Sequence, residues 1–237
     1  MGDSRGKGWR NGHLVVAIDG PAASGKSSTA QWVAAELGFR HVDSGSLYRA
    51  ATAAALGSGV PPESWTPDLV LEQAGRVSLV PRDTSFAPTV DGEDVTADIR
   101  GGPVTSRVAQ VAQMQVVRGW VNARVREVST RFDVVVDGRD MGTAVFPDAE
   151  LKVFLVADPW ERARRRLVQR LGRRPDDDEI ALETEALVRR DAADATQTVQ
   201  ARDAILVDTT QLTQPEQVER IVALARAMIR TARPGSG

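Results

Sequence analysis

The feature that most constrains the fold of this 237-residue chain is a glycine-rich loop near its start, Gly20-Pro21-Ala22-Ala23-Ser24-Gly25-Lys26-Ser27. The loop satisfies the pattern GxxxxGK[ST] in full, and it lies between an apolar β-branched run, residues 14–19, and a helical stretch, residues 26–37. In that setting backbone N–H groups wrap an anion, the lysine reaches the β- and γ-phosphates and the serine can bind Mg²⁺. Residues Gly20 to Ser28 therefore predict a nucleoside triphosphate site, which a chance glycine turn rarely imitates.

Five short apolar runs alternate with helical stretches along the chain. Because these runs are nearly continuous in Val, Ile and Leu, they indicate strands of a parallel sheet that is buried on both faces. We expect an α/β fold, a doubly wound parallel five-stranded sheet with helices on both faces and ligands beyond the carboxyl ends of its strands. The expected strands are 14–19, 40–42, 132–136, 151–156 and 204–207, and the expected helices are 26–37, 46–56, one long helix over 104–130, one from 159, one ending near 195, and 215–230.

Residues 61–103 have a different character. Val, Thr and Gly alternate there with acids around a turn at Asp91-Gly92, which favours a small antiparallel insertion. We expect one domain over residues 14–232 that contains this insertion. Residues 1–13 and 233–237 are expected to be flexible tails.

Composition excludes several classes of protein. The 30 Lys and Arg against 32 Asp and Glu give a net charge of −2, so the whole molecule has no basic field for a nucleic acid polymer. There is no cysteine and there are two histidines, which excludes a disulfide framework and makes a histidine-rich metal site implausible. No apolar run is long enough to span a membrane. We expect a cytoplasmic protein with no membrane partner, and a monomer is plausible.

The remaining classes are motors, GTPases and small-molecule kinases. The chain has no NKxD motif to read guanine, and it ends after one small sheet, which leaves little room for the additional elements of a helicase. A compact kinase for a small acceptor fits best.

Four segments carry a resemblance to a known family. These are residues 20–28, Asp43-Ser44-Gly45-Ser46-Leu47-Tyr48-Arg49, residues 92–95 with Ile99-Arg100, and Asp137-Gly138-Arg139-Asp140-Met141-Gly142-Thr143 through Phe146-Pro147-Asp148-Ala149. In order and spacing they resemble bacterial cytidylate kinase along most of residues 14–232. The resemblance implies Mg²⁺-dependent transfer of the ATP γ-phosphoryl group to CMP or dCMP, with 61–103 as the acceptor-binding insertion and 161–195 as an arginine-rich lid.

The same resemblance implies roles for individual residues. An acceptor phosphate is already largely dianionic at neutral pH, so the reaction needs no general base and depends on positioning and charge. Ser44, Tyr48, Arg49, Arg139 and Arg190 would hold the acceptor, and Asp194 would meet its ribose. Tyr48 can equally be a core aromatic. The expected catalytic cations are Lys26, Arg139, Arg190, Arg162 and Arg166.

The acceptor base has its own expected partners. Cytosine offers an amino donor where uracil offers a carbonyl, so a carboxylate accepts from the first and repels the second. Asp140 is the natural discriminator, and Arg118 would donate to the ring acceptors unless it is a plain surface arginine. Asp137 can accept from Ser27 or reach Mg²⁺ through water, and these two residues form the expected metal site.

Residues 161–174 hold seven arginines, which alone would indicate a nucleic-acid patch. The segment directly follows a core strand, residues 176–179 neutralise its far end, and it has no interleaved aromatics for base stacking. It therefore favours a lid over the triphosphate, with Arg162, Arg165 and Arg166 as candidate ligands and other arginines simply solvated.

Two departures from the family stand out. After Arg190 the family pattern RDxxDxxR ends here in Gln197 instead of an arginine, with no Ser-Pro-Leu segment behind it, and Arg202 is a possible substitute. Ala109 stands where some members place a serine near the base. The alternatives left open are a kinase for another small acceptor, such as UMP, and a regulatory protein that binds nucleotides without turnover.

Overall fold

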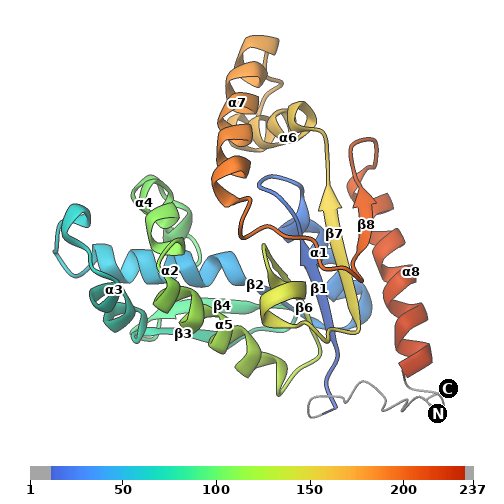
Figure 1. The fold of residues 1–237 in the computed structure, drawn as a ribbon, viewed down its shortest axis with the longest axis horizontal. Coiled ribbons are helices and arrows are strands. Elements are labelled where there is room, and N and C mark those ends of the chain that lie inside the picture. The colour runs from blue at the N-terminus through green and yellow to red at the C-terminus, as the bar shows by residue number, and fades with distance from the viewer. Residues whose placement is uncertain (1–11, 233–237) are drawn as a thin grey trace.

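The computed structural model describes residues 12–232, so most of the two expected tails lies outside the described residues. Its main sheet has the order β2-β6-β1-β7-β8 with all neighbours parallel (Figure 1). This confirms the α/β class and places the strand that precedes the phosphate loop (residues 20–27) at the centre of the sheet. The strands are β1 (Val15–Asp19), β2 (Arg40–Asp43), β6 (Val134–Gly138), β7 (Leu151–Val156) and β8 (Ile205–Asp208).

Alternating side chains of β1 build two cores, one on each face of the sheet. Val15 and Ala17 pack with α2 (Ser44–Leu56) and α5 (Gln115–Ser129). Val16 and Ile18 pack with α1 (Lys26–Leu37) and α8 (Gln214–Ala232) on the other face. Because both faces are covered by helices, functional side chains are accessible chiefly at the carboxyl edge of the sheet.

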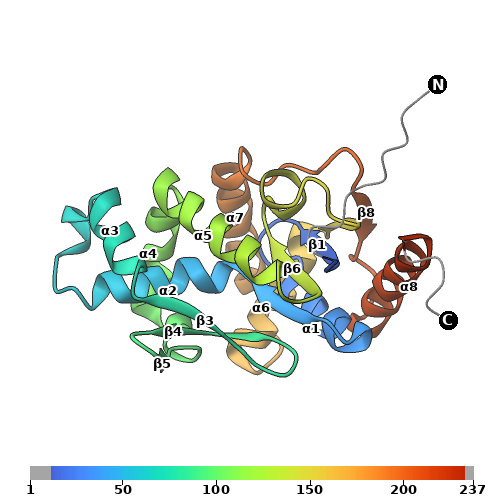
Figure 2. The same cartoon turned by 90° about the horizontal axis from the view of Figure 1, so that it is seen from below.

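The insertion contains a second sheet and a helix. Its strands β3 (Val77–Pro81), β4 (Phe86–Val90) and β5 (Glu93–Asp94) pair antiparallel, as expected. Helix α3 (Pro67–Ala74) and short 3₁₀ turns at Pro62–Ser64 and Asp98–Arg100 accompany them (Figure 2). The sequence analysis missed α3, although Thr66 caps its N-terminus, accepting from Leu69 N, and Pro67 opens its first turn.

The prediction of one long helix over 104–130 is wrong. The structure has α4 (Gly102–Ala112) followed by α5, with Gln113 and Met114 between them. Neither residue is a glycine or proline, so no local signal marks the break. The break leaves the carbonyl of Ala112 without an intrahelical partner. Arg118 Nη1 of α5 lies 3.4 Å from this carbonyl oxygen and partly replaces the missing hydrogen bond.

Two helices rise beside the phosphate loop, α6 (Pro159–Leu171) and α7 (Asp177–Asp194) (Figure 1). Asp158 caps α6, and a capping box of Asp176 and Glu179 starts α7. Their apolar faces pack together through Ala163, Leu167, Ile180 and Leu187, and this small core also contains Ala22 of the phosphate loop.

A π-helical turn, Met141–Val145, follows β6. No helix within the described residues is long and apolar enough to cross a membrane.

Candidate active site

The phosphate loop joins β1 to α1 in a conformation that suits an anion. Gly25 has φ 87° at the N-cap of α1, a conformation that a Cβ disfavours. A Cβ on Gly20 would overlap the carbonyl oxygen of Leu155 in β7, so the loop can approach that strand only with glycine there. Ser24 is fully buried, and its Oγ has no partner among the described residues. The cradle and the unused hydroxyl fit a bound phosphate.

Lys26 lies buried inside this loop, and its Nζ donates to the carbonyl of Pro21 at 3.0 Å. Burial, with the nearby charge of Arg139, lowers the pKa of Lys26 to about 7. A phosphate group bound at the loop would add negative charge beside Lys26 and would raise its pKa again.

A buried polar network lies behind the lysine. Ser27 Oγ donates to Asp137 Oδ2 at 2.5 Å, and His41 Nε2 lies 2.7 Å from Asp137 Oδ1. Burial opposes the charge of Asp137, but the His41 hydrogen bond and the charges of His41 and Lys26 hold its pKa below the usual value. Ser44 Oγ donates to the carbonyl of Asp137 at 2.7 Å. The hydroxyl of Ser27 and the carboxylate of Asp137 form an oxygen pair of the kind that Mg²⁺ prefers.

Within residues 12–232 no group of three His, Cys, Asp or Glu side chains could hold a metal on its own. A cation at Ser27 and Asp137 would therefore need further oxygen ligands from water or phosphate, which is usual for Mg²⁺.

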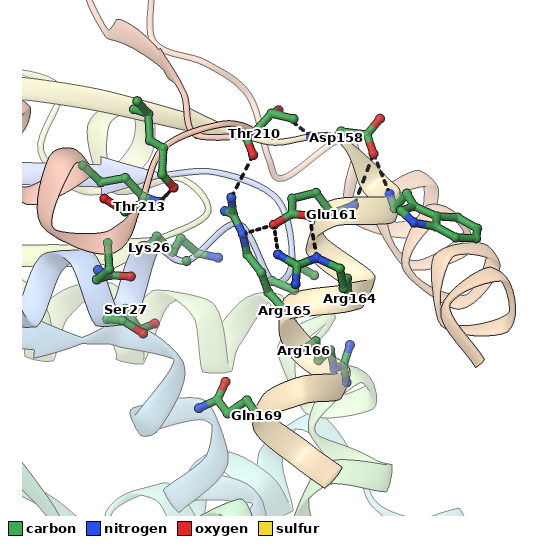
Figure 3. Close-up of a pocket in the computed structure, with 18 of the residues that line it drawn as sticks. Lys26, Ser27, Asp158, Glu161, Arg164, Arg165, Arg166, Gln169, Thr210 and Thr213 are labelled. Carbon is green, nitrogen blue, oxygen red and sulfur yellow. Dashed lines mark hydrogen bonds and ion pairs between the residues drawn. The ribbon is translucent and has the colours of Figure 1, made fainter. Parts of the chain in front are cut away.

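A cavity of about 1210 Å³ opens in front of the phosphate loop. Figure 3 shows Lys26 and Ser27 on one side of it and the α6 residues Arg164, Arg165 and Arg166 on the other. The predicted site residues that line the cavity are Ala22, Ala23, Gly25, Lys26, Ser27, Ser28, Arg49, Arg139, Arg165, Arg166 and Arg190.

Arg100 also lines this cavity, and the sequence analysis gave it no role. It comes from the end of the insertion, and its Nη2 lies 3.3 Å from Asp43 Oδ2. Its place beside Ile99, within a segment that carries the family resemblance, was the available signal. The insertion therefore contributes a cation to the same cavity as the phosphate loop.

The arginines of the expected lid lie in different environments. Arg162 is 4% exposed and does not line the cavity; its Nε, Nη1 and Nη2 donate to Ala157 O, Ala22 O and Asp191 Oδ2 at 3.1, 2.8 and 2.7 Å. Arg165 bonds Glu161 and the carbonyls of Thr209 and Thr210. Arg166 lies at the cavity with Nε 3.3 Å from Glu183. Arg162 therefore ties α6 and α7 to the phosphate loop, whereas Arg166 faces the open space.

Arg139 and Arg190 meet at one carboxylate. Arg139 Nη2 donates to Asp194 Oδ2 at 3.1 Å, and Arg190 Nε lies 3.7 Å from the same oxygen. Burial and the neighbouring Arg139 lower the pKa of Arg190. Asp194 itself does not line the cavity. Its carboxylate contacts Arg139 and Arg190, which do line the cavity, and so offers these two cations an anionic partner within the protein.

The two expected base-reading residues contact each other. Arg118 on α5 forms an ion pair with Asp140, which follows β6, and both side chains are largely buried. Arg118 Nη1 also donates to Gln197 Oε1 at 2.7 Å. Tyr48 packs against the cores around α2, and burial raises its pKa to about 12. These residues lie outside the cavity lining proper.

The turn that carries Asp140 is held by an acid that the sequence analysis gave no role. Asp19, at the end of β1, accepts from Met141 N at 2.9 Å and from Gly142 N at 2.7 Å. Burial raises the pKa of Asp19 to about 6. Its position at a strand end was a signal, but its partners lie about 120 residues away.

Comparisons with known proteins show which family the chain resembles. A family model described as Cytidylate kinase matches residues 16–227. A cytidylate kinase of Streptomyces griseus is 41% identical over 219 residues, which cover 89% of this chain and 92% of the relative. One of Thermus thermophilus is 43% identical over 212 residues, covering 90% and 98%. A solved shikimate kinase from Bacteroides thetaiotaomicron aligns at 14% identity with a TM-score of 0.47, covering 92% of this chain and 98% of that one.

Proposed function

The chain belongs to the cytidylate kinase family, and we propose from that premise a role for each group of its site residues. The enzyme transfers the γ-phosphoryl group of ATP to CMP or dCMP, giving ADP and the corresponding diphosphate. The observation that carries the proposal is the ion pair between Arg118 of α5 and Asp140 of the turn after β6. Asp140 directly follows Arg139, which lines the cavity.

On the donor side, the backbone of the phosphate loop and Lys26 hold the β- and γ-phosphates. Ser27 Oγ would bind Mg²⁺ directly and Asp137 through water, and the bound cation would neutralise charge on the phosphates. Support for this metal site comes from the 2.5 Å contact between the two side chains at the base of the loop. His41 and Ser44 position Asp137, so Ser44 acts through the carbonyl of Asp137 in this arrangement.

On the acceptor side, the cavity arginines hold the phosphate of CMP. Arg49, Arg139 and Arg190 lie on the wall formed by α2, the β6 turn and α7, and Arg166 faces them from α6. The acceptor oxygen is already charged, so these residues orient it in line and stabilise the charge that spreads over the transferred group. Arg162 contributes by positioning the loop, since each of its three side-chain nitrogens donates to a protein group.

Asp140 reads the acceptor base. Arg118 holds its Oδ2, and its Oδ1 would accept from the cytosine amino group. A uracil carbonyl at the same position would be repelled, because both the carbonyl oxygen and the carboxylate of Asp140 are hydrogen-bond acceptors. Asp194 would exchange one arginine contact for a ribose hydroxyl when the substrate binds.

Residues 61–103 are proposed as the acceptor-binding insertion and residues 161–195 as the lid. The cytoplasmic location, the monomeric state and the absence of nucleic acid partners stay predictions from the sequence.

The test is an ATP-consumption assay with Mg²⁺ against CMP, dCMP, UMP, AMP and GMP, for the wild type and Asp140→Asn. We expect turnover with CMP and dCMP, and a loss of CMP preference of about tenfold or more in the variant, because an amide can face a carbonyl with its donor. An unchanged preference would remove Asp140 from base reading. Turnover of UMP as fast as CMP would favour a kinase that also accepts other small acceptors. Binding of nucleotides without turnover would favour a regulatory protein.

A further inference from the structure

A glutamine stands where the family resemblance leads one to expect a phosphate-binding arginine, and it contacts the base-reading pair. Gln197 follows α7 and is separated from Arg118 by 79 residues, yet its Oε1 accepts from Arg118 Nη1 at 2.7 Å. The same guanidinium pairs with Asp140 through Nη2. Three elements distant in the sequence, α5, the β6 turn and the segment after α7, thus meet at one cation.

The chemistry of this contact fixes the orientation of the glutamine. A guanidinium can only donate, so the amide oxygen must face Arg118 and the amide NH₂ group must face away. The side chain of Arg118 is 11% exposed and that of Asp140 is 13% exposed, so both ends of the guanidinium are fixed in a largely dry setting. An arginine at position 197 would bring a like charge to this place, whereas glutamine adds an acceptor without adding charge.

We propose that Gln197 is a positioning residue that fixes Arg118 against Asp140 and thereby sets the preference of this enzyme for cytosine over uracil. This inference rests on the proposed reading of the base by Asp140. Without Gln197, Arg118 keeps only one strong partner, because its contact to Ala112 O is 3.4 Å long. The guanidinium then rotates on its flexible stem, and the carboxylate of Asp140 rotates with it. The amino group of cytosine loses an oriented acceptor, and the uracil carbonyl meets a less directed repulsion.

The test measures equilibrium binding of CMP and UMP to the full chain by calorimetry in the absence of ATP, together with kcat at saturating CMP. In Gln197→Met, which has similar size and no amide, we expect the Kd for CMP to rise about tenfold while the Kd for UMP changes less than about twofold. We expect kcat to stay within about twofold. Gln197→Asn, which keeps the amide but is too short to reach Arg118, should behave like the methionine variant. Gln197→Glu, which keeps an acceptor at the same reach, should retain the preference for CMP.

The matched control is Gln200→Met. Gln200 is exposed, and its side chain lies 3.3 Å from Ala204 O. We expect its Kd values for both nucleotides to stay within about twofold of the wild type.

A double-mutant cycle separates a positioning role from a direct one. If Gln197 acts through Arg118, the change Gln197→Met has no further effect on the CMP preference in an Arg118→Met background. A wild-type preference in Gln197→Met, or an additional loss in the Arg118→Met background, overturns the inference while the proposed function stands. A wild-type enzyme that binds neither CMP nor dCMP overturns the proposed function itself, and the inference with it.

Discussion

At the scale of single residues, the phosphate loop carries a strained alanine. Ala23 has φ 57°, a left-handed conformation that costs an L-residue about 1 kcal/mol. Its neighbour Ala22 has no positive φ and is buried against α6. We expect Ala23→Gly to raise the free energy of unfolding by no more than about 0.5 kcal/mol, because relief of the strain is largely offset by the greater freedom that glycine gives the unfolded chain. The measurement is chemical denaturation without nucleotide.

The matched control for this prediction is Ala22→Gly. It removes a packed methyl group and loosens the unfolded chain, so we expect it to lower stability by about 1 kcal/mol. A destabilised Ala23→Gly would mean that the alanine methyl group makes contacts that outweigh the strain.

Asp19 makes stability depend on pH. Its pKa is about 6 in the folded protein against 3.8 as the ordinary value, because it is buried. Between pH 4 and 6 the unfolded chain loses the proton and the folded chain keeps it, so the contribution of Asp19 is present below pH 4 and is lost as pH rises to 6. Over the whole titration the difference corresponds to about 3 kcal/mol, of which about 2 kcal/mol falls between pH 4 and pH 6.

We therefore expect Asp19→Asn to gain about 2 kcal/mol in stability relative to the wild type as pH rises from 4 to 6. Urea denaturation of both proteins at several pH values measures this. A difference that is constant over the range would show that the two backbone N–H bonds keep Asp19 charged throughout.

The sequence predicts the residues of the phosphate loop because their roles are local. Strand, glycines, lysine and serine follow one another within 14 residues, from Leu14 to Ser27, so spacing alone places them. The contact of Arg118 with Gln197 spans 79 residues and that of Asp19 with Met141 spans 122. Such pairs depend on how the elements pack, and no spacing rule expresses them. The expected role of Arg162 as a free phosphate ligand stays a prediction that its buried contacts do not favour.

At the scale of elements, Arg162 joins α6 and α7 to the phosphate loop. In Arg162→Met the carboxylate of Asp191 loses its partner, and the carbonyl of Ala22 loses a donor. Because the side chain of Asp191 is 25% exposed, we expect a loss of about 2 to 3 kcal/mol, below the value for a fully buried pair. Urea denaturation without nucleotide measures it, with the more exposed Arg164→Met, expected within about 0.5 kcal/mol, as control.

The double variant Arg162→Met, Asp191→Leu should recover part of this stability, because it removes the unpaired carboxylate as well. If Arg162 were instead a free ligand of phosphate, the single variant would fold as stably as the wild type and would lose only affinity for ATP.

The elements were predicted best where an apolar run is bounded by turn residues. The limits of α1 and β7 follow the sequence closely, since glycine loops or prolines bound them. The break between α4 and α5 had no such signal, because it is stabilised by tertiary contacts of Arg118 with Ala112 and Asp140. Helix α3 had a readable start at Thr66-Pro67. The strand-like residues from Val77 onward led to an interpretation of the whole insertion as antiparallel strands.

At the scale of the whole molecule, like charges face one another across the cavity. Burial lowers the pKa of Arg49, and the charges of Arg100 and Arg166 lower it further. The charges of Arg139, Arg166 and Arg49 act in the same way on Arg190. These arginines come from α2, the insertion, the β6 turn, α6 and α7, so their mutual repulsion opposes approach of the insertion to the α6–α7 pair. Phosphates placed between them would change repulsion into attraction.

We therefore expect the insertion and the α6–α7 pair to move closer when CMP and a non-hydrolysable ATP analogue bind together. The chain has no cysteine, so spin labels can be placed at Glu72→Cys on α3 and Leu182→Cys on α7, both exposed, without a background signal. The distance between the two labels, measured by pulsed electron resonance, should shorten most with both ligands, since each brings only part of the negative charge. A second pair, Glu36→Cys on α1 and Glu219→Cys on α8, lies on two helices of one packed core and should show no change. An unchanged first distance would mean that the cavity arginines are held apart by the fold itself and that the nucleotides enter an arrangement that is already closed.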